Sequence, residues 1–148
     1  MNTIKETFFN LSDKVVLVTG ANGQIGLSLV KKLLNSQAKV VAVDLKVNHL
    51  NKIKQDNNIK NKQILILKKN IKNLNDVKKV FSEGRYKFNY INGLICNAGV
   101  AVFDSYLDRK EKALDKVIDV NIKGTFYCIR EFIKNHKKKD KEATIVNV

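Results

Sequence analysis

The sequence of 148 residues has no proline and no tryptophan, one methionine, two cysteines and only 14 acidic residues against 28 basic ones. The cysteines at 96 and 128 are too few for a disulfide scaffold, and without a CxxC pair or a Cys/His cluster we expect no metal site. No apolar run approaches the roughly 18–20 residues that cross a bilayer, and residues 1–14 lack the features of a signal peptide. We therefore expect a cytoplasmic protein with no membrane partner.

The formal net charge of +14 is the unusual feature of the composition. A basic excess can indicate nucleic-acid binding, yet the arginines that read base edges number only three: Arg85, Arg109 and Arg130. The lysines are spread along the chain among asparagine and isoleucine, most densely over residues 48–75. We interpret the charge as a compositional bias and expect no nucleic-acid partner. A nucleic-acid binder would instead show an affinity that falls steeply with salt.

Short apolar runs alternate with stretches of helical periodicity. Five runs predict strands buried on both faces: residues 15–18, 40–43, 64–67, 94–96 and 143–148. Apolar residues at helical spacing predict four helices: residues 25–34, 46–57, 74–81 and 112–137. This alternation predicts a single α/β domain over residues 1–148. We expect a three-layer αβα Rossmann-type fold, with a parallel sheet of about five strands in the order 3-2-1-4-5.

A glycine-rich turn, TGANGQIG at residues 19–26, joins the first predicted strand to the first helix. Glycines there permit a tight turn, close approach of the backbone to a pyrophosphate, and close packing of helix on strand. The phosphates would face the free N–H groups and the positive end of the helix dipole. Because the motif lies between a strand and a helix, we interpret it as a dinucleotide-binding turn.

Asp44 ends the second predicted strand, 18 residues after Gly26. A carboxylate at this position can accept both hydroxyls of the adenosine ribose and repels a 2′-phosphate, which favours NAD over NADP. Lys46 lies nearby and would soften this preference. The alternative is a solvated aspartate at the end of a strand, with no ligand.

Four segments in the expected order resemble the N-terminal part of a short-chain dehydrogenase/reductase. They are residues 9–20 (FNLSDKVVLVTG), the glycine turn, CNAG at residues 96–99 after the fourth strand, and DVNIKGTF at residues 119–126. Together they cover nearly the whole chain. The resemblance implies an NAD(P)-dependent oxidoreductase that transfers a hydride between nicotinamide and a carbonyl/alcohol substrate.

The resemblance also assigns site residues. The pyrophosphate turn would contain Gly20, Gly23 and Gly26, with Asn22, Gln24 and Ile25 beside it. Asp44 and Leu45 would meet the ribose, and Asn70-Ile71 would lie beside the adenine, where the family usually has Asp-Val. The nicotinamide side would be lined by Asn97, Ala98 and Gly99. Asn121 is the one catalytic candidate: it would hold a water in the proton relay through its backbone and a distortion of its helix.

The glycine spacing leaves alternatives open. Gln24 stands where the main branch of the family has its middle glycine, and TGxxGxxG is more typical of the extended branch of sugar-nucleotide epimerases and dehydratases. The Asn-Ala-Gly and Val-Asn-x-x-Gly segments are instead typical of main-branch reductases. A non-catalytic dinucleotide-binding module is a further alternative.

In the family, a catalytic serine follows the fifth strand and a Tyr-x-x-x-Lys pair follows on the next helix, where the tyrosine is the general acid/base. This sequence ends at Asn147-Val148. The spacing Tyr106 to Lys110 matches by coincidence, because it precedes the long helix. We therefore expect an N-terminal portion or fragment that binds NAD, is inactive or partial as a catalyst, and exposes its fifth strand as a sheet edge with apolar side chains on both faces.

The remaining candidates have structural interpretations. Cys96 and Cys128 are expected to be buried apolar residues, and His49 and His136 to lie on the surface. The outer face of the helix at 112–137 often forms a dimer interface in the family, so a homo-oligomer is expected there. Seven apolar positions of that helix are expected to pack on the sheet: Leu114, Val117, Ile118, Ile122, Phe126, Ile129 and Ile133.

Overall fold

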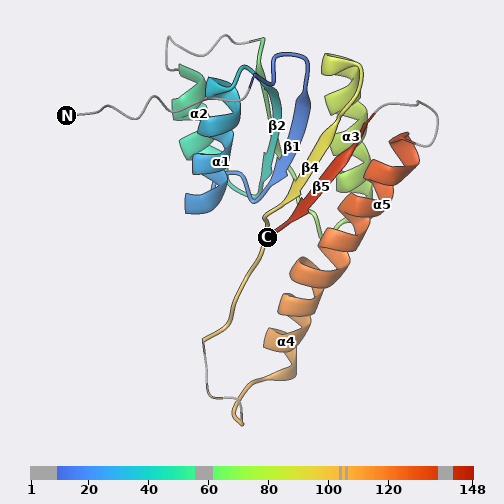
Figure 1. Ribbon diagram of the computed structural model, residues 1–148. Helices are drawn as coiled ribbons and strands as arrows, with labels where there is room; N and C mark the ends of the chain where they lie inside the picture. The colour runs from blue at the N-terminus through green and yellow to red at the C-terminus, as the bar shows by residue number, and fades with distance from the viewer. Residues whose placement is uncertain (1–9, 56–61, 104, 106, 137–141) are drawn as a thin grey trace.

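The computed structural model describes residues 10–55, 62–103, 105, 107–136 and 142–148. It has three layers, with the sheet between two layers of helices (Figure 1). No helix of this described part is long and apolar enough to cross a membrane. The elements in chain order are β1 (Val15–Thr19), α1 (Gln24–Asn35), β2 (Lys39–Asp44), α2 (Asn48–Gln55), β3 (Ile64–Lys68), α3 (Leu74–Phe88), β4 (Gly93–Cys96), α4 (Glu111–Val117), the π-helical segment η1 (Ile118–Gly124), α5 (Thr125–His136) and β5 (Thr144–Asn147).

The five strands form one parallel sheet in the order β3-β2-β1-β4-β5. This confirms the predicted fold class and strand order. All carboxyl ends of the strands lie at one edge of the sheet, and the strand order reverses between β1 and β4. In open α/β sheets, ligands bind in the crevice at such a reversal.

Alternate residues of the central strands pack on opposite helical layers. Leu17 and Val41 belong to the core formed with α3 and α5, whereas Val16 and Val40 belong to the core formed with α1 and α2. Burial on both faces explains why β1 and β2 are continuous apolar runs in the sequence. It also holds their carboxyl ends in fixed positions.

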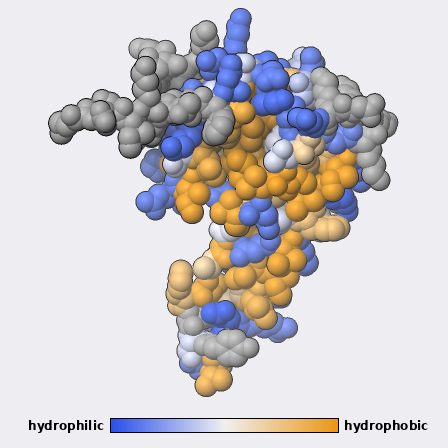
Figure 2. Space-filling view, viewed as in Figure 1, coloured by the Kyte–Doolittle hydropathy of each residue, from blue (hydrophilic) through white to orange (hydrophobic). Residues whose placement is uncertain are grey.

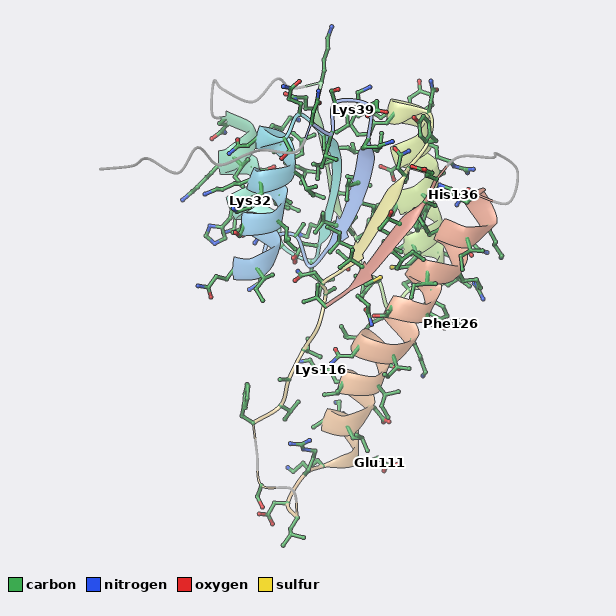
Figure 3. The ribbon with its side chains drawn as sticks, viewed as in Figure 1. Lys32, Lys39, Glu111, Lys116, Phe126 and His136 are labelled. Atoms are coloured by element: carbon green, nitrogen blue, oxygen red, sulfur yellow. The ribbon has the colours of Figure 1, made fainter. Side chains whose placement is uncertain are left out.

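The long C-terminal helix has the predicted extent but not the predicted orientation. It runs from Glu111 to His136, the two ends labelled in Figure 3, and η1 interrupts its α-helical pattern. Five of the apolar residues expected to pack on the sheet face outward and are 38–63% exposed: Leu114, Ile118, Ile122, Phe126 and Ile133. Cys128 and Phe132 are buried instead. Periodicity located an apolar face, but this helix has apolar residues on two sides.

The layer of α1 and α2 does not extend across β4 and β5. Figure 2 shows apolar surface in this region, between α1 and α5, and along the projecting part of the molecule that contains α4. Every residue of β5 is exposed, as expected of an apolar edge strand. A groove of about 270 Å³ lies on this face, bordered by Val16, Leu33, Ile95 and Val146 among others.

Other expectations differ in detail. The weak helix expected at 46–57 is α2, which ends at Gln55, and residues 56 and 57 lie outside the described residues. Phe9, Tyr106 and residue 137 also lie outside them. The prediction of a surface position for His136 was wrong: it is half-buried, its ring centroid is 4.5 Å from that of Phe132, and its Nδ1 lies 3.2 Å from the Phe132 carbonyl oxygen.

Candidate functional site

A cleft of about 200 Å³ opens at the carboxyl edge of the sheet. Complete ligand sites usually have about 300–1,000 Å³, so the cleft fits one part of an extended ligand. Seven of its lining residues were predicted as cofactor-binding: Gly20, Asp44, Leu45, Asn70, Ile71, Ala98 and Gly99. Four were not: Val43, Lys69, Val100 and Val120. All four directly adjoin a predicted residue in the sequence, which is the signal that would have found them.

Two glycines of the turn are required by backbone contacts. Gly20 has φ +62°, and a Cβ on it would lie 2.7 Å from the Cα of Ala98. A Cβ on Gly26 would lie 2.1 Å from the Gly20 carbonyl oxygen and 2.7 Å from the Cα of Ala21. Gly23 has no such constraint, since its nearest neighbour would be the Gly20 oxygen at 3.4 Å. Gly20 thus joins the turn to the loop after β4, and Gly26 sets α1 against the turn.

No side chain in the described part of the structure caps the N-terminus of α1. Gly23 occupies the N-cap position, and the first turn contains no acidic residue. The first N–H groups of a helix have no intrahelical partner, and among the described residues nothing accepts from those of Gln24 and Ile25. Such a helix end, with its positive dipole, can bind an anionic group such as a pyrophosphate.

Asp44 is held at the end of β2 by two backbone donors. Its Oδ2 accepts from the backbone N–H of Asn22 at 2.9 Å, and its Oδ1 accepts from that of Lys46 at 3.1 Å. Leu45, next to it, is exposed. A carboxylate oxygen accepts more than one hydrogen bond, so both oxygens can still receive ribose hydroxyls.

The segment after β3 forms another wall of the cleft. The backbone N–H of Asn70 donates to Asp76 Oδ2 at 3.0 Å, and Asn70 Oδ1 accepts from the backbone N–H of Lys72 at 3.0 Å. Ile71 is buried against η1, where a Cβ on Gly124 would lie 2.8 Å from the Ile71 Cδ1. This wall is therefore fixed to both α3 and η1.

The Asn97-Ala98-Gly99 loop is hydrogen-bonded to the end of β1. Asn97 Nδ2 donates to the carbonyl oxygens of Thr19 and Gly20 at 3.2 and 3.1 Å. The backbone N–H groups of Asn97 and Ala98 both donate to Thr19 Oγ1 at 3.1 Å. The side chain of Asn97 thus joins the loop after β4 to the end of β1, while Ala98 and Gly99 line the cleft.

Asn121 lies within η1, so the helix distortion that the resemblance implies is present at this residue. Its Oδ1 accepts from the backbone N–H of Val100 at 2.9 Å, and its Nδ2 donates to the Val100 carbonyl oxygen at 3.0 Å. This pair fixes the backbone that borders the cleft. The water relay itself stays a prediction.

One ion cluster joins η1 to the segment after β3. Asp119 lies 3.2 Å from Lys72 Nζ and 2.8 Å from Lys123 Nζ. Hydrogen bonds from Lys123 and Lys72 lower the pKa of the Asp119 carboxyl, and the same Asp119 bond raises the pKa of Lys123. Asp119 and Lys123 are therefore both charged near neutral pH.

The two cysteines lie beneath the site but do not take part in it. Burial raises the pKa of the Cys96 thiol to about 11. Burial and the neighbouring Cys96 raise that of Cys128 to about 12. Neither thiol is a nucleophile near neutral pH, because nucleophilicity requires the thiolate. The described part of the chain contains no cluster of three His, Cys, Asp or Glu side chains that would hold a metal ion.

The structure divides the predicted site residues into three groups. Gly23, Gln24, Ile25 and Gly26 form the N-terminus of α1 and do not line the cleft. Seven line the cleft, whereas Asn22, Asn97 and Asn121 direct their side-chain amides to other parts of the protein. Their hydrogen-bond partners are up to 78 residues away in the sequence. No local sequence signal could have predicted those pairs.

Comparison with known proteins was made against families, curated sequences and solved structures. The family described as short chain dehydrogenase matches residues 14–148. An uncharacterised oxidoreductase of Staphylococcus saprophyticus is 32% identical over 140 residues, covering 94% of this chain and 55% of the relative. The NAD-dependent glycerol dehydrogenase of Listeria innocua is 32% identical over 118 residues, covering 80% of this chain and 45% of that protein. The chain spans about half the length of the curated relatives it matches.

Two solved structures from Brucella melitensis are similar over the same region. A 3-ketoacyl-(acyl-carrier-protein) reductase complexed with NADH matches with a TM-score of 0.85 at 26% identity, covering 93% of this chain and 57% of that one. A short-chain dehydrogenase/reductase described as a glucose/ribitol dehydrogenase matches with a TM-score of 0.86, covering 94% and 57%. At 22% identity, the second likeness concerns the fold alone.

Proposed function

Since the chain belongs to the short-chain dehydrogenase/reductase family, we propose that residues 1–148 form a single NAD-binding domain and that the whole protein is a cytoplasmic oxidoreductase. The cofactor site would be the cleft at the carboxyl edge of the sheet. The glycine turn would approach the pyrophosphate, the segments at Asp44 and Asn70 would receive the adenosine half, and the loop at Ala98 would border the nicotinamide.

One observation carries this proposal: the open N-terminus of α1 and the carboxylate of Asp44 are joined within a single turn. The Asn22 N–H that binds Asp44 is two residues before Gln24, the first residue of α1. An anion-binding helix end and a hydroxyl acceptor are therefore close together, as a dinucleotide requires. The positive φ of Gly20 and the tight contact at Gly26 support the same assignment.

The preference for NAD over NADP rests on Asp44. A carboxylate accepts ribose hydroxyls and repels a 2′-phosphate, which carries about −1.5 to −2 charges. The side chain of Lys46 is exposed and would reduce this discrimination without reversing it, since solvent screens its charge.

NAD supplies hydride transfer, and the substrate in the whole protein would be a small molecule with a carbonyl/alcohol pair. Asn121 would hold a water of the proton path through its backbone in η1. The named relatives are dehydrogenases and reductases, which supports this reading over the epimerase or dehydratase alternative. The exposed apolar face of α4, η1 and α5, with Leu114, Ile122 and Phe126, would pair with a second copy.

Titration of the 148-residue chain with NADH, followed by cofactor fluorescence, tests the proposal. We expect saturable binding at moderate salt and weaker binding of NADPH. Asp44→Asn removes the charge but keeps an acceptor, so it should weaken NADH binding and reduce the preference over NADPH. Binding that falls steeply with salt and is equal for both dinucleotides would contradict the proposal, because it would indicate nonspecific attraction to the basic surface.

A further inference from the structure

Helix α2 is capped by a residue that lies neither in the helix nor in the loop that precedes it. It begins at Asn48, and the preceding Val47 has no side-chain acceptor. The backbone N–H groups of His49 and Leu50 instead donate to Asn22 Oδ1, at 3.0 and 3.1 Å. These are the second and third residues of the helix, whose N–H groups an N-cap side chain normally satisfies. The cap comes from the glycine turn, 27 and 28 residues earlier.

The orientation of the Asn22 amide is determined by its partners. Since a backbone N–H can only donate, the atom that meets His49 and Leu50 must be the carbonyl oxygen. Asn22 Nδ2 then donates to Asn48 Oδ1 at 3.1 Å. The backbone N–H of the same residue donates to Asp44 Oδ2 at 2.9 Å. One residue thus joins the turn, the carboxylate and the start of α2.

The N-termini of α1 and α2 therefore differ in whether their backbone N–H groups are available to a ligand. Within the described residues, no side chain caps the first N–H groups of α1, whereas the N–H groups of His49 and Leu50 in α2 donate to Asn22. The backbone N–H of Lys46 is used by Asp44 Oδ1. Beside the carboxylate, three backbone donors that would otherwise suit an anion are thus occupied.

We propose that Asn22 is a specificity-determining residue that, together with Asp44, excludes dinucleotides with a 2′-phosphate. This rests on the proposed NAD site. Asp44 rejects the phosphate by charge, and Asn22 removes the donors that would compensate, because its carbonyl oxygen occupies the N-terminus of α2. A phosphate next to the ribose would meet the Asp44 carboxylate, the Asn22 carbonyl oxygen and the capped N-terminus of α2, none of which offers it a donor. The two ribose hydroxyls of NAD can instead donate to the Asp44 carboxylate.

Asn22→Ala in the 148-residue chain is the first test, with NADH and NADPH titrated separately. The substitution frees the N–H groups of His49 and Leu50, so NADPH binding should strengthen relative to NADH by roughly fivefold or more, since hydrogen bonds to charged groups are among the stronger ones. Asn48→Ala is the matched control: it removes the partner of Nδ2 but leaves the Oδ1 cap. The ratio of NADH to NADPH affinity in Asn48→Ala should equal the ratio in the unsubstituted chain.

Asn22→Asp separates specificity from folding. An aspartate keeps the acceptor that caps α2, although it loses the Nδ2 donor to Asn48. With the cap kept, NADPH binding should not strengthen as it does in Asn22→Ala, and strengthened NADPH binding in this variant would overturn the inference. If Asn22→Ala does not fold, Asn22→Ser takes its place, since the shorter side chain does not reach the same N–H groups.

The outcomes are distinguishable. If the unsubstituted chain binds NADH but loss of the α2 cap in Asn22→Ala does not change the ratio of NADH to NADPH affinity, the inference is wrong and the proposed function stands. Equal weakening of both dinucleotides in Asn22→Ala would also overturn it. If the unsubstituted chain binds neither dinucleotide, the proposed function fails and the inference fails with it.

Discussion

At the residue scale, three asparagine side chains hold the walls of the cleft together. Asn22, Asn97 and Asn121 each act through the side-chain amide on backbone groups of another segment, and Asn22 and Asn121 use both ends of it. An amide supplies a donor and an acceptor in one planar group, which a carboxylate or a hydroxyl in the same geometry does not. The positions of the walls thus depend on residues that do not themselves line the cleft.

Gly26 is a position where the addition of one methyl group should destabilise the fold. In Gly26→Ala the new Cβ would meet only backbone atoms, at 2.1 and 2.7 Å, so the turn must move. We expect a loss of about 1–3 kcal/mol in the free energy of unfolding, measured by chemical denaturation. Gly23→Ala is the control: its closest contact is 3.4 Å and its φ is −74°, so its stability should stay close to that of the unsubstituted chain. Equal losses in both would contradict the proposed difference.

At the element scale, the long C-terminal helix connects the two sides of the cleft. Its π-helical segment carries Asn121 toward Val100 and Gly124 against Ile71. The extra residue of a π turn changes the direction of the side chains that follow, and such segments often occur at functional sites. Here it lets one helix contact the loop after β4 and the segment after β3 together.

Asn121→Ala should release the loop after β4 without unfolding the sheet. The Val100 N–H then loses its acceptor, so its amide hydrogen exchange should accelerate by at least about tenfold, as one lost hydrogen bond of roughly 1.4 kcal/mol implies. Exchange at Leu17 in β1 is the internal control and should stay slow. Unchanged protection of Val100 would show that the loop is held by other contacts.

Helix α3 offers a test of local capping next to the site. Asn73 Oδ1 accepts from the backbone N–H groups of Asn75 and Asp76 at 2.8 and 3.1 Å. Asn73→Ala should therefore lower the free energy of unfolding by about 1 kcal/mol. The control is Asn75→Ala, because Asn75 is the exposed second residue of α3. Its free energy of unfolding should be unchanged or slightly higher, since alanine has a high helix propensity. Thermal unfolding of both variants would check this, and the reverse order would contradict it.

At the scale of the whole molecule, the core lies on both faces of the central strands β1 and β2 and contains two buried thiols, from which a pH dependence of stability follows. Cys96 and Cys128 belong to one core cluster, between β4 and α5. Their pKa values of about 11 and 12 lie above the ordinary value of 9.0. The folded chain therefore keeps protons that the unfolded chain loses above pH 9.

We accordingly expect the free energy of unfolding to decrease as pH rises from about 9 toward 12, by an amount on the order of 5 kcal/mol, since each pH unit between the unfolded and folded pKa of a thiol corresponds to about 1.4 kcal/mol. The thiol contribution is fully present below the unfolded pKa and is lost progressively as the pH rises through the folded pKa values. Urea denaturation across this range measures the effect. The Cys96→Ala, Cys128→Ala double variant is the reference, since its tyrosines and lysines still titrate. It should show a shallower decline, and an identical slope would contradict the assignment.

Much of the fold follows from local patterns in the sequence. The strands β1 and β2 are recognisable as continuous apolar runs because both of their faces are buried. The glycine turn and Asp44 are recognisable because each adjoins the end of a strand, and parallel strands bring their carboxyl ends to one edge. The sequence by itself thus determined the α/β class and strand order, and through its resemblance to the short-chain dehydrogenases it identified most of the cleft lining.

Only the tertiary structure decided which face of the long helix meets the sheet and where the asparagine amides bind. Periodicity marks an apolar face but does not distinguish one side from the other when both carry apolar residues, so Leu114 and Ile122 were assigned to the wrong side. The contacts from Asn22 to α2 and from Asn121 to Val100 join segments 21 to 28 residues apart. Such hydrogen bonds have no period and no local signature, because they depend on how the folded elements approach one another.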